Sequence, residues 1–250
     1  MSLYLACIIF FSVIGTAFIS GMFGMVGGTM LMGIFLQLFP PATAMAMHGV
    51  SQLIGNSYRT WVWRKYIYKP VLPGYLLGAL SSILFFTALQ IQFELKFIYL
   101  FLGLLPFITF ILPKDKNFDI TRNYMSMITG ITIITFQLSA GVTGGFLDQA
   151  FLSSPLDRRQ QIATKSLIQV IAHLIKIIYF TVLLQNAASW QGLTWQAAAI
   201  MAVAAIAGTS LSTKPVQKMK QETFVWISTV LLMLTGVFFL YKSVIAFHHS

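Results

Sequence analysis

The stretch GMVGG at residues 24–28 returns as GVTGG at residues 141–145, with glycine at the same three positions. The two stretches lie 117 residues apart, and the same offset places Gln52 on Gln169 without a gap. Apolar stretches often match by chance, whereas a glycine pattern and a polar residue shared at one offset indicate an internal duplication. We therefore predict a chain built from two related halves.

The composition places both halves in a membrane. Hydrophobic residues make up 57% of the 250 residues, charged residues only 9%, and the mean hydropathy is +0.80. Soluble domains carry about 25% charged residues, so this chain has too few polar side chains to cover a surface in water. The composition excludes a soluble globular enzyme and a disordered chain, and it predicts an all-α polytopic membrane protein.

Apolar blocks divide the chain into about eight predicted transmembrane segments, since a crossing helix needs about 20 apolar residues. The first and fifth blocks are long and broken by glycine, which leaves open whether each spans twice or is re-entrant. The same order of lengths occurs twice, which predicts repeats at 1–113 and 114–250 in one membrane domain. The blocks are residues 3–39, 42–63, 71–89, 95–112, 124–155, 162–184, 193–211 and 223–247.

The basic residues predict how each repeat lies in the membrane. The net charge of +10 comes mainly from short connections between blocks, and such residues favour the cytoplasmic side. With all four basic connections inside, the second block runs inward and the sixth block runs outward. The repeats are then inverted about an axis in the membrane plane, which is typical of secondary transporters. The connections are 64–69, 114–122, 158–159 and 214–220.

Polar residues in the second and sixth blocks recur at steps of four, four and three, which places each set on one helical face. The repeat offset pairs the two sets residue by residue. Both contain donors and cations and no carboxylate, so together they predict a pocket for a small anion near the membrane midplane. The sets are His48, Gln52, Asn56 and Arg59, and Lys165, Gln169, His173 and Lys176.

Structural roles are the alternative for each of these residues. Gln52 and Gln169 could bond to each other as interhelical contacts. Arg59, Lys165 and Lys176 lie toward block ends, where long basic side chains snorkel to the headgroups. The register match between the two repeats favours the binding interpretation, and we take His48, Gln52, Asn56, Lys165, Gln169 and His173 as substrate-binding candidates.

The glycine breaks supply further candidate ligands. Broken helices leave backbone N–H groups without intrahelical partners, and at membrane depth such groups persist only where protein or a cavity covers them. The N-terminus of a resumed helix also favours an anion. We therefore include Gly27, Gly28, Gly144 and Gly145 as binding candidates, with close helix packing as the alternative.

Asp148 is the one acidic residue well inside an apolar block, three residues beyond Gly145. A carboxylate in the membrane needs a partner or a purpose. We consider it a candidate for proton coupling, an ion partner of Lys165 or His173, or a solvated residue beside an unwound segment.

The glycine stretches followed by Ala46-Met47-His48 and Ala163-Thr164-Lys165 resemble the TauE/SafE family of sulfite exporters over essentially the whole chain. The resemblance implies eight segments in inverted halves. It also implies a multi-pass permease of the plasma (inner) membrane that moves sulfite, sulfoacetate or related sulfur-containing anions.

Together these features predict a secondary transporter for a small anion, a sulfur oxyanion or an organosulfonate, working by alternating access. The alternatives are an anion channel on the same scaffold, a membrane-embedded enzyme using His48, His173 and Asp148, and a membrane scaffold.

Expected partners are the anion, the lipid bilayer and protons as coupling ion, because histidine titrates near neutral pH; a homo-oligomer is left open. No zinc-ligand spacing or nucleotide-binding loop occurs, so we expect no metal, no cofactor, no catalytic residues and no nucleic acid.

Overall fold

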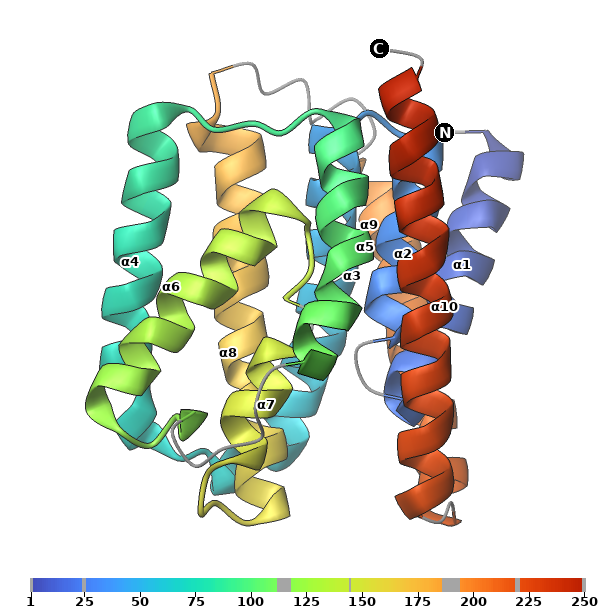
Figure 1. The fold of residues 1–250 in the computed structure, drawn as a ribbon. Helices are drawn as coiled ribbons and strands as arrows, with labels where there is room; N and C mark the ends of the chain where they lie inside the picture. The colour runs from blue at the N-terminus through green and yellow to red at the C-terminus, as the bar shows by residue number, and fades with distance from the viewer. Residues whose placement is uncertain are drawn as a thin grey trace.

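The computed structural model describes residues 2–23, 26–111, 118–143, 145–185, 194–218 and 221–248. These residues form helices and short connections, without a strand (Figure 1). In this part of the chain five helices are long and apolar enough to cross a membrane: Leu3–Phe23, Lys69–Leu89, Arg158–Leu183, Trp195–Ser212 and Trp226–His248. The prediction of an all-α membrane protein is therefore confirmed.

The described residues of the first half of the chain form five α-helices, whose bounds follow the apolar blocks closely. The long first block divides into two helices, as its glycines predict. These helices are α1 (Leu3–Phe23), α2 (Val26–Leu38), α3 (Pro41–Trp63), α4 (Leu72–Leu89) and α5 (Leu95–Ile111), with two short 3₁₀ turns, Arg64–Tyr66 and Lys69–Val71, before α4. Pro41 begins α3, where the fixed φ of proline suits the first helical position.

The second half repeats this order. The long fifth block also divides into two helices, and α9 extends past Leu211, where its apolar block ends. The helices are α6 (Asn123–Ser139), α7 (Phe146–Leu152), α8 (Arg158–Ile178), α9 (Trp195–Lys218) and α10 (Gln221–His248). Asp157 caps α8 by accepting from the backbone N–H groups of Arg159 and Gln160. A π-helical turn, Tyr179–Leu183, lengthens α8.

The polar helices α3 and α8 pack against each other in antiparallel directions. Near the C-terminal end of α3, the backbone N–H of Tyr68 donates to Thr164 Oγ1 at 2.8 Å. Near its N-terminal end, His48 bonds to Lys176 late in α8. Although α3 has 23 residues, it is not among the five apolar spans, because its polar stripe lowers its hydropathy.

Three further helix pairs surround this centre: α1 with α9, α4 with α6, and α5 with α10. Small residues allow the close approaches that helices in membranes use. A Cβ at Gly78 of α4 would collide with the backbone of Met127 in α6, and one at Gly130 would collide with the backbone of Tyr75. The α4–α6 contact is therefore a backbone-to-backbone crossing.

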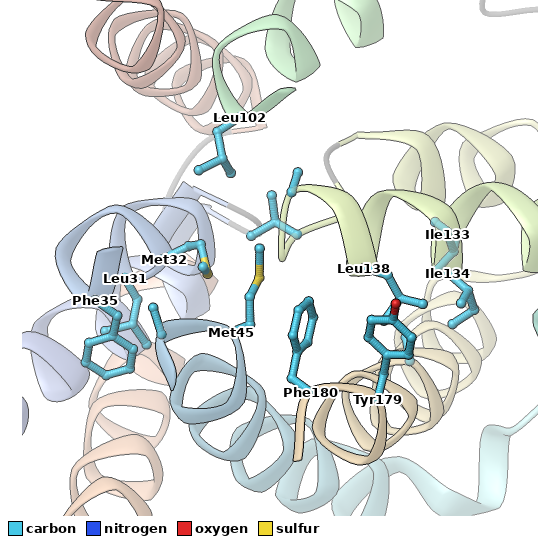
Figure 2. Close-up of a cluster of buried hydrophobic side chains, with 14 of the residues drawn as sticks. Leu31, Met32, Phe35, Met45, Leu102, Ile133, Ile134, Leu138, Tyr179 and Phe180 are labelled. Carbon is cyan, nitrogen blue, oxygen red and sulfur yellow. The ribbon is translucent and has the colours of Figure 1, made fainter. Parts of the chain in front are cut away.

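A buried apolar cluster joins α2, α3, α5, α6 and the end of α8 (Figure 2). Met32 and Met45 meet near the centre of this cluster, with Phe180 beside Met45. Gly141, just beyond α6, has a φ of +78°, and a Cβ there would lie 2.6 Å from the sulfur of Met45. Gly141 thus packs against Met32 of α2 and Met45 of α3, which places the connection after α6 beside the polar stripe of α3.

Candidate functional site

A cavity of about 90 Å³ lies between α3 and α8. A single water needs roughly 10–15 Å³ on the same scale, so the cavity admits several waters or one small anion. Its wall includes all six polar side chains taken as binding candidates and Gly28: His48, Gln52, Asn56, Lys165, Gln169 and His173. Residues of α1, α2, α6 and α9 complete the wall. The structure therefore brings the two polar stripes together around one space, and their role in binding stays a prediction.

One end of the cavity is closed by a buried hydrogen-bond chain. Nζ of Lys176, fully buried, donates to Nδ1 of His48 at 2.7 Å and to the carbonyl oxygen of Gly141 at 2.8 Å. His48 Nε2 lies 2.9 Å from the carbonyl oxygen of Gly28 and must donate, because a carbonyl only accepts. The structural alternative for Lys176, snorkelling to the headgroups, is wrong, because its side chain has no exposure.

Gln137 of α6 joins His173 at the same end. Its Nε2 donates to His173 Nδ1 at 2.7 Å, and the rings of His48 and His173 lie 5.7 Å apart. The sequence interpretation missed Gln137, which is also fully buried. The repeat offset contained a signal, since it pairs Gln137 with Ser20, and both residues line the cavity.

The other end of the cavity carries an ion pair. Lys165 Nζ donates to Asp148 Oδ1, and the two side chains are 30% and 32% exposed. Asp148 therefore takes the role of ion partner, one of its three predicted alternatives. Arg59 also lines this part of the wall and donates to Asn56 Oδ1 at 3.4 Å. A carboxylate thus lies beside the cations, although the two stripes themselves contain none.

The two matched glutamines face the cavity without bonding to each other. Gln169 Nε2 donates to Thr143 Oγ1 at 3.1 Å, in the connection after α6. Within the described part of the chain, no hydrogen bond joins Gln52 to Gln169. The amide of Gln52 lies 3.7 Å from where a Cβ of Gly28 would be, so Gly28 leaves room beside it.

The candidate glycines separate into two groups. Gly28 lines the cavity, whereas Gly27 packs against α1, where a Cβ would lie 2.6 Å from the backbone nitrogen of Ser20. Gly145 packs on Thr109 and lines a second cavity of about 50 Å³. Gly144 lies outside the described residues. Close packing therefore accounts for the positions of Gly27 and Gly145.

The chemistry of the cavity suits an anion better than a cation or a metal. Its wall presents ammonium, guanidinium, imidazole and amide donors and no carboxylate from the described residues, although one lining residue, Lys165, is ion-paired with Asp148. Among the described residues, no cluster of three His, Cys, Asp or Glu side chains could hold a metal ion.

These features define an integral membrane protein with a polar cavity enclosed between two central helices. A family model described as Sulfite exporter TauE/SafE matches residues 8–239. The chain therefore belongs to the TauE/SafE sulfite exporter family, whose members are membrane transporters, and the resemblance noted from the sequence is confirmed. No curated protein and no solved structure matches the chain.

Replacing Lys176 tests the hydrogen-bond chain at the closed end. Lys176→Met keeps the length of the side chain but leaves Nδ1 of His48 and the carbonyl of Gly141 unpaired, at roughly 1–3 kcal/mol for each group. We expect a clearly lower thermal unfolding midpoint in detergent. Lys65→Met, which replaces an exposed lysine, is the control and should have the same thermal unfolding midpoint as the wild type. Equal midpoints for both variants would show that the chain does not stabilise the fold.

Proposed function

We propose that this protein is a secondary transporter that moves sulfite, or another sulfur-containing oxyanion or organosulfonate, across the plasma (inner) membrane. The substrate binds near the midplane, between the two repeats, and alternating access moves it across. One observation carries the proposal. Six donor and cationic side chains from matched positions of α3 and α8 line one cavity, and Gln52 lies at the middle of α3. Membership in a transporter family agrees with it.

The packing of the helices supports two inverted repeats, α1–α5 and α6–α10. In these repeats α1 corresponds to α6 and α4 corresponds to α9. Exchanging the repeats therefore turns the α1–α9 pair into the α6–α4 pair, and both pairs are in contact. The same exchange maps α3–α8 and α5–α10 onto themselves, and both are in contact as well. The antiparallel directions of α3 and α8 are those that an axis in the membrane plane requires.

In this conformation the cavity opens toward the cytoplasmic side of the membrane. Lys65 and Arg158 lie exposed where α3 ends and α8 begins, and basic residues favour the cytoplasm. The partly exposed Lys165 lies two turns further along α8, whereas His48 and Lys176 close the opposite end. We infer an inward-facing state, in which the buried Lys176–His48 contact separates the site from the outside.

Each group at the cavity has a role in holding an anion. Lys165 and Arg59 supply charge near the open end, and Gln52 and Gln169 supply amide donors at the middle. The N–H of Gly28 lies in the first turn of α2, where amide groups lack intrahelical carbonyls and favour an anion. No single donor neutralises the substrate, so the site holds it through several weaker contacts that rocking of one repeat can break.

We propose that Asp148 couples transport to protons. While Asp148 is ionised it holds Lys165 in an ion pair, so this lysine is not available to the substrate. Protonation of Asp148 would break the ion pair and free Lys165 for the substrate. We expect acidification on the cavity side to stimulate sulfite flux in the wild type. Asp148→Asn removes the competing charge, so its flux should be high and insensitive to the imposed proton gradient. A variant that keeps the wild-type response would exclude Asp148 from coupling.

An anion channel would need an open path through the bundle. The buried chain of Lys176, His48 and the carbonyls of Gly28 and Gly141 closes the cavity at one end. This closed end favours the transporter. Flux that saturates with sulfite concentration distinguishes the transporter from a channel.

Replacing either matched glutamine tests the site directly. Gln52→Leu and Gln169→Leu keep the side-chain size but remove a donor to a charged ligand, which is worth about 1.5–3 kcal/mol. The sulfite concentration for half-maximal flux into proteoliposomes should rise roughly tenfold or more in each variant. Gln37→Leu changes an exposed glutamine of α2 and should transport like the wild type. Normal flux in both cavity variants would remove the site assignment.

Cysteine labelling tests the inverted arrangement. In a Cys7→Ser background, Lys65→Cys, Arg158→Cys and Gln92→Cys each place one thiol at an exposed position. An impermeant maleimide should label Gln92→Cys in intact cells, and the other two only after permeabilisation. Labelling of Lys65→Cys and Arg158→Cys from opposite sides would contradict the inverted repeats.

A further inference from the structure

Gln137 has one hydrogen-bonding atom without a partner. Its side chain is fully buried on α6 and forms part of the cavity wall. Nε2 donates to His173 Nδ1 at 2.7 Å, while Oε1 has no hydrogen-bond partner among the described residues. Buried polar atoms are nearly always paired, so an unpaired amide oxygen beside a cavity indicates a missing donor.

A ligand in the cavity is the candidate for the missing donor. No described protein group reaches Oε1, and the cavity is the space next to Gln137 that a ligand can occupy. The neighbouring His173 offers the opposite chemistry. Because its Nδ1 accepts from Gln137, the neutral ring carries its hydrogen on Nε2, which is therefore a donor. A hydrogen-bond acceptor and a donor thus lie side by side at the closed end.

We propose that Gln137 selects the substrate by accepting a hydrogen bond from it. The inference rests on the proposed function and narrows its substrate class to small monoanions that carry a donor group. A monoprotonated oxyanion meets this requirement through its O–H, and sulfamate meets it through its N–H. The donor group of such an anion bonds to Gln137 Oε1. Its charged oxygens accept hydrogen bonds from His173, Gln52 and Gln169. An anion of the same size and charge without a donor leaves Oε1 unpaired and binds more weakly.

Sulfamate and methanesulfonate form a matched pair of probes. Both are monoanions with an SO₃ group, and they differ by an amino group in place of a methyl group. Binding of each is measured by calorimetry on the purified full-length protein. We expect the wild type to bind sulfamate about tenfold more tightly, in keeping with one hydrogen bond to a buried group. Gln137→Leu should bind the two anions with equal affinity, whereas Gln37→Leu should keep the wild-type ratio.

Each outcome decides the proposal. Equal affinity in the wild type would show that a water satisfies Oε1, and a preference that survives in Gln137→Leu would assign selection to another residue; either result overturns the inference and leaves the proposed function standing. If neither probe binds and sulfite does not bind either, the proposed function fails as well. Gln137→Met replaces Gln137→Leu if the latter does not fold, and the comparison in the wild type needs no variant.

Discussion

A buried lysine in a membrane protein must find its hydrogen-bond partners inside the protein, and here Lys176 finds them on other segments of the bundle. It bonds to His48 of α3 and to the carbonyl of Gly141 beyond α6, while His48 bonds to Gly28 of α2. Unpaired, these groups would each be costly at membrane depth. Their pairing therefore fixes α3 antiparallel to α8. It also fixes the positions of α2 and of the connection after α6 relative to these two helices.

This constraint also creates the cavity. Two polar stripes cannot face lipid, so α3 and α8 turn them toward each other, and the apolar pairs α1–α9, α4–α6 and α5–α10 surround them. Part of each stripe pairs within the protein, as Lys176 does, and part borders open space, as Gln52 does. Structural pairing and the proposed substrate binding thus share the same two helices, with the fully buried pairing at the closed end.

The sequence predicted the helices and most of the cavity because both depend on local patterns. The lengths of the apolar blocks predicted where the membrane-spanning helices lie. The helical spacing of the polar residues predicted six side chains that line the same cavity. Snorkelling stayed an alternative for Lys176 because the residue lies toward the end of its apolar block, whereas the π turn Tyr179–Leu183 continues α8 and leaves the lysine inside the bundle. Gln137 was missed because it belongs to neither of the two matched polar stripes, and its proximity to His173 depends on tertiary packing. The packing role of Gly27 likewise depends on the position of α1, which no local pattern contains.

The central claim is that an anion sits between the two inverted stripes. Selenite resembles sulfite in shape and charge, and its selenium can be located by anomalous diffraction from crystals of the protein. The account predicts an anomalous peak between α3 and α8, beside Gln52, Gln169 and His173. A selenium site elsewhere in the protein, or an empty cavity at a selenite concentration that saturates transport, would contradict it.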